Sequence, residues 1–366
     1  MLTDAVSGVR DKARLAGFFT KLTVKEHLAP NLHVRPLVAE LFLTDNCNLK
    51  CVSCACWRTT TRSELDTDEW KSVISQLADT GIIKANFTGG EPLLRRDAPE
   101  LMAHAYAAGI RNLHLNSNAV LLDERRRAAV VDAGVRSFNI SVDGPDVSTH
   151  ELIRGVAGSF DKTIDNLRAL LAMRHDVPLR VRMNFTVMRS NLRALPDMIR
   201  LAQSLGVRLY LNLATDTTFL FRDEQVTAEA HNDRADLRDV LAEVEALLRQ
   251  DRRLVPRYSE WRYLSGHFSE RLQRELPCAE SQLKLMVHSR GEVGGCWGHD
   301  PKESARALPI ASIVDSAYYR VEHARFYRKD CVGCGSNYAL NLRWRPSSYA
   351  HDVMWRLGRR SVVPAR

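Results

Sequence analysis

The chain contains the stretch Leu41-Phe-Leu-Thr-Asp-Asn-Cys-Asn-Leu-Lys-Cys-Val-Ser-Cys54, in which an apolar segment leads directly into three cysteines. Residues 38–43 have the composition of a buried strand. Cys47, Cys51 and Cys54 follow with the spacing C-x3-C-x2-C, so they should lie on the loop that leaves the strand, where α/β folds gather their chemistry. Three thiolates suit zinc, copper(I) or an iron–sulfur centre. Because three ligands leave one metal position open, the pattern favours a catalytic site.

Simple burial or a zinc ribbon could also account for cysteines in such a loop. Free cysteines are often small buried hydrophobic residues, but three thiols within eight residues on a polar loop do not fit that pattern. A zinc ribbon would require a second C-x2-C pair. Cys331 and Cys334 form such a pair, but two further cysteines near the C-terminus complete its ligand set.

Composition indicates a globular protein with a sizeable core. The chain has 366 residues, of which 45% are hydrophobic and 26% are charged. This length suits a catalytic domain with a smaller appendage. The net charge of +8 could indicate a nucleic-acid partner, but the arginines are scattered, so we expect none. We find neither a segment of about 20 apolar residues nor an export signal. We therefore expect no transmembrane segment, a cytoplasmic protein, and eight cysteines that are reduced or metal-bound.

After the cysteine loop, helical and strand patterns alternate. Helices are predicted at 67–80, with Asp66 or Thr67 as cap, and at 97–108, 124–133, 160–174 and 195–205; strands are predicted at 82–87, 112–115, 137–142, 179–187 and 207–213. With the strand at 38–43, six strands alternate with helices. This arrangement predicts an α/β fold with a parallel sheet built from right-handed βα units.

The pattern divides the chain into five parts. Residues 1–36 form an N-terminal helical extension, 37–215 the core, 216–274 a bridging segment with a helix at 237–248, 275–340 a small cysteine-containing domain, and 341–366 a C-terminal tail. The helix expected at 6–22 is amphipathic and basic. It could pack on the core or act as a weak surface anchor, and packing is favoured.

Polar segments follow the second, third and fourth predicted strands. Gly89 and Gly90 would let the backbone approach a ligand closely, and Glu91 could accept a hydrogen bond from an ammonium group. Asn118 follows the third strand, and the sequence Ser-Val-Asp-Gly at 141–144 follows the fourth. Arg154 lies further on; a guanidinium can grip a carboxylate at two points. Without these motifs, Arg154 would be interpreted as a solvated helix charge.

A second cysteine set lies near the C-terminus. Cys278 and Cys296 flank a predicted hairpin, with a strand at 283–288 and a turn at 289–291. With Cys331 and Cys334 they provide four thiolates, which is a complete ligand set for zinc or a [4Fe–4S] cluster.

Taken together, these motifs resemble those of the radical S-adenosylmethionine (SAM) enzymes. The resemblance implies a partial (β/α)6 TIM-like barrel with a small C-terminal β-hairpin/helix domain. Cys47, Cys51 and Cys54 would hold a [4Fe–4S] cluster whose fourth iron is chelated by SAM. The other residues implied to bind this cofactor are Gly89, Gly90, Glu91, Asn118, Ser141, Asp143 and Arg154. Two positions depart from the pattern: Ser53 stands where an aromatic residue is usual, and Ala119 where glycine is usual.

The second cysteine set resembles the SPASM and Twitch auxiliary-cluster domains, through C-x12-G-x4-C. The resemblance implies one auxiliary [4Fe–4S] cluster held by Cys278, Cys296, Cys331 and Cys334. This arrangement is similar to that of 2-deoxy-scyllo-inosamine dehydrogenase and aminoglycoside-modifying relatives. A fully ligated cluster would carry electrons instead of binding substrate.

The implied activity is an oxidoreductase reaction. A flavodoxin or ferredoxin would reduce the first cluster, SAM would be cleaved to a 5′-deoxyadenosyl radical, and the radical would abstract a hydrogen atom from the substrate. We expect a small carbohydrate- or aminocyclitol-like substrate of antibiotic or other natural-product biosynthesis. Dehydrogenation would follow if the auxiliary cluster accepts an electron. Epimerisation would follow if Cys56 returns a hydrogen atom, although Cys56 could equally be inert packing.

Two alternatives remain open. The first is maturation of a ribosomally made peptide, against which the short N-terminal extension and the single auxiliary cluster count. The second is a non-catalytic zinc- or nucleic-acid-binding protein.

Overall fold

A parallel sheet forms the centre of the molecule in the computed structural model, which describes residues 8–58, 63–214, 238–250, 278–296 and 301–327, with 353, 354 and 357. Its strand order among these residues is β6-β5-β4-β3-β2-β1-β7-β8-β9. The first six strands are β1 (Val38–Phe42), β2 (Lys84–Thr88), β3 (Asn112–Ser117), β4 (Ser137–Ser141), β5 (Arg180–Val187) and β6 (Arg208–Leu213). Each pairs in parallel with the next, and the sheet is open, as in a partial barrel.

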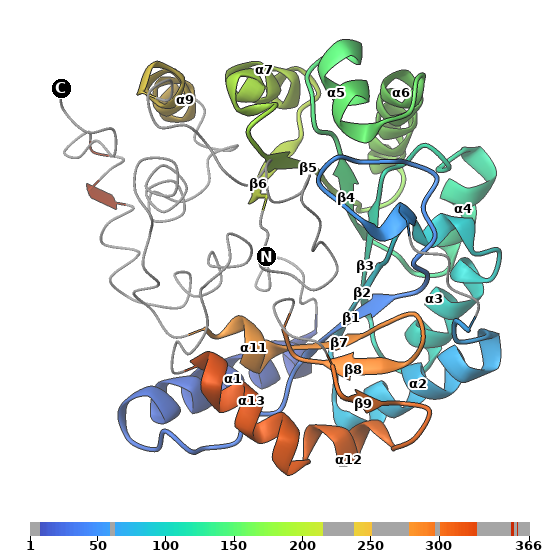
Figure 1. The fold of residues 1–366 in the computed structure, drawn as a ribbon, viewed down its shortest axis with the longest axis vertical. Coiled ribbons are helices and arrows are strands. Elements are labelled where there is room, and N and C mark those ends of the chain that lie inside the picture. Colours follow the sequence, from blue (N-terminus) through green and yellow to red (C-terminus); the bar gives the residue numbers. More distant parts are fainter. Residues whose placement is uncertain are drawn as a thin grey trace.

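Helices cover the outer face of this curved sheet (Figure 1). They are α2 (Thr67–Thr80), α3 (Ala98–Ala107), α4 (Glu124–Asp132), α5 (Val147–Arg154), α6 (Ser159–Ala172) and α7 (Leu195–Ser204), and α7 packs against α9 (Arg238–Gln250). Short 3-10 turns occur at η1 (Cys56–Arg58), η2 (Pro92–Leu94), η3 (Met173–His175) and η4 (Leu192–Ala194). The predicted α/β class and partial barrel are confirmed.

The two faces of the sheet differ in polarity because strand side chains alternate. Apolar strand residues such as Leu41, Phe87 and Phe138 pack with the helices in the main core. Alternate residues are polar and hydrogen-bond one another across neighbouring strands. The Asn86 amide donates to Glu40 at 3.3 Å, for example, and the corresponding pair on β3 and β4 is Asn116 with Asn139, at 3.0 Å. The inner face of the barrel is therefore polar.

Local signals set most element boundaries. All six predicted strands and the five predicted helices of the core are present, with ends displaced by at most a few residues. Helix α2 begins at the predicted position, where Asp66 and Glu69 form a reciprocal capping box. The helix predicted in the bridging segment is α9. The sequence pattern did not indicate helix α5, which begins after Asp146, whose carboxylate accepts a hydrogen bond from the Thr149 amide at 2.8 Å.

The N-terminal helix packs on the domain. It is α1 (Val9–His27), longer than predicted, and its buried residues Leu15, Phe18 and Leu22 share a cluster with Val38 of β1 and with Ala279 and Leu283, which precede the later hairpin. The favoured prediction of packing is confirmed, because this apolar face is covered by protein. No helix in the described part of the chain has the length and apolar character needed to cross a lipid bilayer.

The predicted C-terminal hairpin is present and extends the central sheet. It consists of β7 (Lys284–Val287) and β8 (Glu292–Gly294), followed by β9 (Glu303–Ser304). β7 pairs in parallel with β1, so the hairpin covers the edge of β1 that β2 leaves free. The short helix α11 (Glu280–Leu283) precedes it, and α12 (Ile310–Val314) and α13 (Ala317–Tyr327) follow (Figure 1).

A buried ion cluster secures β7 to β1. The ammonium of Lys284 lies 3.3 Å from the Glu40 carboxylate and 3.1 Å from that of Glu280. Burial opposes the charge on Lys284, but the two carboxylates outweigh this effect and raise its pKa above the usual value.

We predict that Lys284→Met destabilises the protein by about 3–5 kcal/mol, because it leaves two buried carboxylates without their cation. Urea denaturation followed by circular dichroism would measure this change. As a control, the triple variant that adds Glu40→Gln and Glu280→Gln should recover most of the loss. A single variant as stable as the parent would contradict the assignment.

Candidate functional site

The cysteine loop leaves the C-terminal end of β1, as predicted. Cys51 is buried, and Cys47 and Cys54 are half-buried. Burial raises the pKa of the Cys47 thiol to about 12, and the neighbouring Cys51 and Cys54 add to this effect. Burial likewise raises the pKa of Cys51 to about 11. The three thiols are therefore close enough to affect one another, and each would need a cation to become a thiolate.

The thiols are not arranged as a finished metal site. Among the described residues, no group of three or more histidine, cysteine, aspartate or glutamate side chains has the geometry to hold a metal ion. Assignment of the three cysteines to a cluster therefore stays a prediction.

Helix α5 anchors the middle of the cysteine loop. The amide of Lys50 donates to the Arg154 carbonyl at 2.9 Å, and the amide of Val52 donates to the Ile153 carbonyl at 2.9 Å. Gly155 follows with φ +68°, and a Cβ there would lie 2.5 Å from the Lys50 carbonyl oxygen. Glycine is therefore required where the helix ends against the loop.

A buried arginine lies beside the central cysteine. The guanidinium of Arg154 is 3.6 Å from the Cys51 sulfur and 2.8 Å from the Asp143 carboxylate. Burial opposes its charge, but Asp143 and then Cys51 raise the pKa of Arg154, so it stays a cation. Asp143 also accepts a hydrogen bond from the Thr186 amide at 2.9 Å. At 9% exposure, Arg154 is not a solvated helix charge.

Gly89 and Gly90 pack the turn after β2 against the start of the cysteine loop. The Gly90 amide donates to the Thr44 carbonyl at 2.7 Å, and the Glu91 amide donates to the Asn46 carbonyl at 2.8 Å. An added Cβ would lie 2.3 Å from the Thr44 carbonyl oxygen at Gly89 and 2.2 Å from that of Asn46 at Gly90. In this structure the two glycines therefore allow the backbone of the turn to approach the backbone of residues 44–46 closely.

The Glu91 side chain joins this turn to the end of β3. It is fully buried and accepts hydrogen bonds from the Leu93 amide at 3.1 Å, the Ser117 hydroxyl at 2.9 Å and the Asn118 amide at 2.8 Å. Burial raises the pKa of Glu91 despite these donors. Its described partners are therefore protein groups, which position the loops.

Asn118 connects the third strand to the cysteine loop. Its side-chain amide donates to the Asn48 side chain at 2.8 Å and lies 4.0 Å from the Cys47 sulfur. Ala119 has a φ of +59°, so this alanine adopts the conformation that favours glycine, the residue usual in the family that the motifs resemble. Ser141, the last residue of β4, pairs with Asn184 of β5 and is half-buried.

The remaining predicted residues lie in three places. Cys56 opens η1 and is 8% exposed; its hydrogen bond, followed by burial, raises the pKa of Cys54. Cys278 precedes β7 and Cys296 follows β8. Because β7 is parallel to β1 and β8 antiparallel to β7, both lie toward the end of the sheet where β1 begins, opposite the cysteine loop. Cys331 and Cys334 lie outside the described residues.

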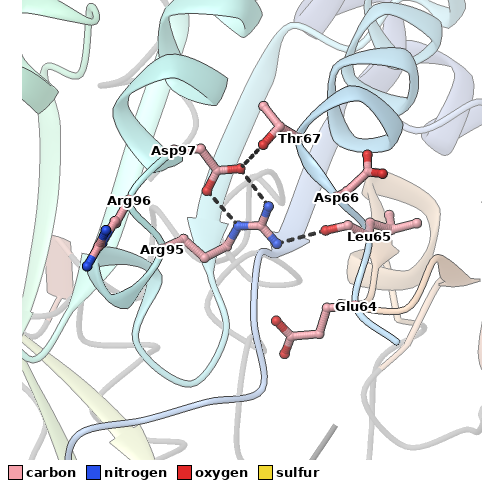
Figure 2. Close-up of a pocket in the computed structure, with 7 residues that line it drawn as sticks. All are labelled: Glu64, Leu65, Asp66, Thr67, Arg95, Arg96 and Asp97. Atoms are coloured by element: carbon pink, nitrogen blue, oxygen red, sulfur yellow. Dashed lines mark hydrogen bonds and ion pairs between the residues drawn. The ribbon is translucent and has the colours of Figure 1, made fainter. Parts of the chain in front are cut away.

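A shallow pocket of about 570 Å³ lies beside these loops (Figure 2). It is lined by Glu64, Leu65, Asp66, Thr67, Arg95, Arg96 and Asp97. The Arg95 guanidinium is held by Asp97 at 2.6 and 2.9 Å and by the Leu65 carbonyl at 2.8 Å. None of the predicted site residues lines the pocket, and its polar groups are largely engaged with one another, so we assign it no ligand.

Glu64 is a site residue that the sequence did not indicate. Its carboxylate accepts hydrogen bonds from the Asp45 amide at 2.8 Å and the Thr44 hydroxyl at 2.9 Å, just ahead of the first cysteine. Glu64 lies ten residues beyond Cys54 in a charged stretch, so no local pattern marked it.

Comparison with known proteins supports the family indicated by the motifs. Residues 41–202 match the model of the Radical SAM superfamily. This part of the chain, a little under half of its length, is thus similar to a radical SAM domain. The family uses a [4Fe–4S] cluster and SAM, in agreement with the predicted cofactors. The donor chemistry of the residues suits these groups, because three thiols that can become thiolate ligands lie on one loop beside a buried guanidinium.

Curated relatives are similar over about half of the chain. A PqqA peptide cyclase of Rhodopseudomonas palustris is 40% identical over 172 residues, which are 46% of this chain and 44% of that protein. An AdoMet-dependent heme synthase of Nitratidesulfovibrio vulgaris is 30% identical over 196 residues, 52% of each. The chain therefore spans about half the length of these relatives. Neither of these two relatives is named as an aminocyclitol dehydrogenase, so the specific likeness to 2-deoxy-scyllo-inosamine dehydrogenase stays a prediction.

Solved structures share the fold at low identity. Streptococcus suis SuiB bound to the precursor peptide SuiA has a TM-score of 0.63 and 16% identity, covering 94% of this chain and 80% of that one. The structure of anSMEcpe with bound AdoMet has a TM-score of 0.62 and 16% identity, covering 88% and 98%. At this level of identity they establish the fold alone.

We predict that Gly90→Ala destabilises the protein by about 1–3 kcal/mol, because its Cβ would overlap the chain next to Cys47. The variant should also bind less iron after anaerobic reconstitution, measured as iron per chain. Gly17→Ala is a matched control; its Cβ meets nothing within 4 Å in α1, so stability should rise slightly. Wild-type stability and iron content in Gly90→Ala would count against this packing.

Proposed function

We propose that the protein is a radical SAM enzyme that acts on a peptide. The observation that carries this proposal is the 40% identity of its radical SAM segment to a PqqA peptide cyclase. The peptide alternative thus has better support than the small carbohydrate substrate that the motifs suggested. The heme synthase relatives favour a second candidate, a haem precursor as substrate.

Different residues of the chain would bind the cluster and SAM. Cys47, Cys51 and Cys54 would hold the [4Fe–4S] cluster. The turn at 89–91, with Asn118, Ser141 and Asp143, would border the bound SAM. When bound, these groups supply a one-electron reductive cleavage that gives methionine and a radical able to remove a hydrogen atom from a C–H bond.

Arg154 would have an electrostatic role in this site. It is a buried cation 3.6 Å from the Cys51 sulfur, so it would offset the negative charge of a thiolate there. Asp143 holds the guanidinium in place at 2.8 Å. The remaining guanidinium donors could bind a carboxylate of SAM, in keeping with the resemblance. Burial of these groups keeps water away from the reacting centre.

The second cysteine set would form the auxiliary site. Cys278 and Cys296, with Cys331 and Cys334, would hold one [4Fe–4S] cluster in the small domain at 275–340. A flavodoxin or ferredoxin would supply the electrons. Epimerisation through Cys56, or dehydrogenation of the substrate, stays a prediction about the outcome of the reaction.

We predict that the anaerobically reconstituted protein binds about eight irons per chain, as two [4Fe–4S] clusters require, and releases 5′-deoxyadenosine when reduced with SAM. Cys51→Ala should lose about half of the iron and all of the release. Cys278→Ser should lose about half of the iron as well, but should retain the release of 5′-deoxyadenosine. A colourless preparation that contains zinc in place of iron would contradict the proposed enzyme activity.

The substrate can be tested with the same preparation. Synthetic PqqA peptide of Rhodopseudomonas palustris is the first probe, and mass spectrometry should detect a peptide that has lost hydrogen. A haem precursor is the second probe. Turnover of the precursor, with the peptide unchanged, would overturn the peptide proposal in favour of the second candidate.

A further inference from the structure

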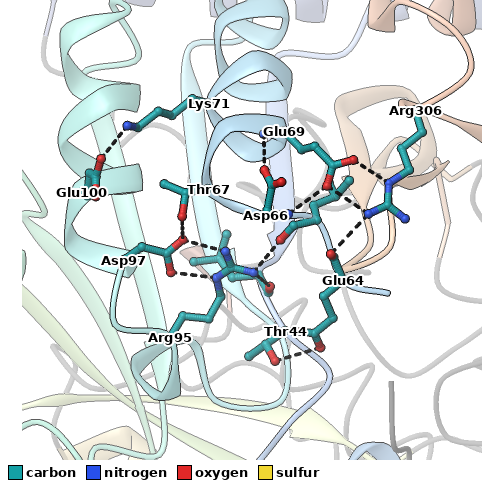
Figure 3. A network of polar contacts seen from close by, with 12 residues as sticks. Thr44, Glu64, Asp66, Thr67, Glu69, Lys71, Arg95, Asp97, Glu100 and Arg306 are labelled. Carbon is teal, nitrogen blue, oxygen red and sulfur yellow. Dashed lines mark hydrogen bonds and ion pairs between the residues drawn. The ribbon is translucent and has the colours of Figure 1, made fainter. Parts of the chain in front are cut away.

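Chain segments far apart in sequence meet beside the entry to the cysteine loop (Figure 3). They are residues 44–46 after β1, residues 63–69 at the start of α2, and residues 289–296 and 301–306 of the C-terminal hairpin and its continuation. We call the contacts among them the loop brace. The brace lies outside the set of residues that the resemblance assigns to cofactor binding.

The inner half of the brace is Glu64. Its carboxylate binds the Asp45 amide at 2.8 Å and the Thr44 hydroxyl at 2.9 Å. The same hydroxyl accepts a hydrogen bond from the Asn46 amide at 3.1 Å. These bonds fix the backbone up to the residue before Cys47. A hydrogen bond to a charged acceptor is among the stronger ones in a protein.

The outer half of the brace is Arg306. Its guanidinium forms a two-point contact with the Glu69 carboxylate, at 2.8 and 2.9 Å. It also donates to the carbonyls of Ser63, at 3.0 Å, and Glu64, at 3.2 Å. The hairpin adds a backbone bond, from the Leu65 amide to the Ser289 carbonyl at 2.7 Å.

An isolated surface ion pair would contribute little to the stability of the protein. Arg306 makes more contacts than such a pair. Arg306 uses its planar fork on a carboxylate while its other donors bind two successive carbonyls, so it restrains both the side chain of Glu69 and the backbone at 63–64. Glu69 is itself fixed, since its carboxylate accepts a hydrogen bond from the Asp66 amide at 2.9 Å. Because the backbone at residue 64 is restrained, the positions available to the Glu64 carboxylate are restricted as well.

We propose that Glu64 and Arg306 are positioning residues of the cysteine loop, and that the C-terminal hairpin sets the geometry of that loop through them. Arg306 holds the 63–65 segment, and Glu64 transmits this restraint to the residues that precede Cys47. The hairpin, which carries Cys296 at its far end, is thus joined to the first cysteine set by contacts that span more than 240 residues of sequence.

We predict that Glu64→Gln and Arg306→Gln each accelerate iodoacetamide labelling of Cys47 in the metal-free protein, by roughly tenfold for a lost hydrogen bond to a charged group. Peptide mass spectrometry of a labelling time course under native conditions would measure the rate. Amide hydrogen exchange at Asp45 should accelerate in parallel. Arg306→Lys should give an intermediate rate, because lysine supplies charge without the fork.

Arg200→Gln is the matched control. Like Arg306, Arg200 is a partly exposed arginine in an ion pair. It contacts the carboxylates of Asp197 and Glu243 and lies on α7, outside the loop brace. Its substitution should leave Cys47 labelling unchanged. Urea denaturation would confirm that each variant is folded. If Arg306→Gln does not fold, Arg306→Lys takes its place in the labelling experiment.

Unchanged labelling of Cys47 in both folded variants would overturn the proposal. The assay uses protein without metal, so its outcome does not depend on the proposed enzyme activity. Faster labelling in a protein that never binds iron would refute the proposed function and leave the brace intact. In reconstituted protein, the brace variants should change the electron paramagnetic resonance spectrum of the first cluster, and Arg200→Gln should not.

Discussion

The end of β1 is the point on which the rest of the site depends. There the chain leaves a parallel sheet and enters a loop whose backbone forms several of its hydrogen bonds with neighbouring segments. The turn after β2 supplies some of the partners, through Gly90 and Glu91, and the end of α5 supplies others, through carbonyls 153 and 154. Unpaired polar backbone groups are costly when buried. The cysteine loop is therefore held by its neighbours, and its conformation follows from the barrel around it.

Charge in this region is arranged around a buried guanidinium. Arg154 has an acidic partner in Asp143 and a sulfur in Cys51, so its positive charge lies where a thiolate would need it. Leaving a buried arginine without partners would be expensive, and the carboxylate offsets that cost. The same principle recurs at the other end of β1, where Lys284 lies between Glu40 and Glu280. One buried ion thus holds β1 to β7, and the other lies beside the loop that follows β1.

The hairpin changes how the two cysteine sets relate to each other. The sequence pattern favours a small domain appended to a barrel, but β7 is a direct neighbour of β1. Cys296 is consequently tied to the sheet whose opposite end carries Cys47, Cys51 and Cys54. The loop brace adds a second connection, because Arg306, beyond the hairpin, binds the 63–64 backbone and Glu64 binds the residues that follow β1.

The sequence by itself determined the order and type of the elements and the two cysteine spacings. Strand periodicity, the cap at Asp66 and the C-x3-C-x2-C spacing are local signals, and local sterics and hydrogen bonding enforce them. The sequence pattern did not predict helix α5, because its N-cap residue Asp146 lies just after the Ser-Val-Asp-Gly motif at 141–144. That motif, and not a helical pattern, is the stronger signal in this segment. Only the tertiary structure decided that Arg154 contacts Cys51, 103 residues earlier, and that Arg306 restrains Glu64. Such contacts depend on which strands become neighbours, and no periodicity within a single element records that choice.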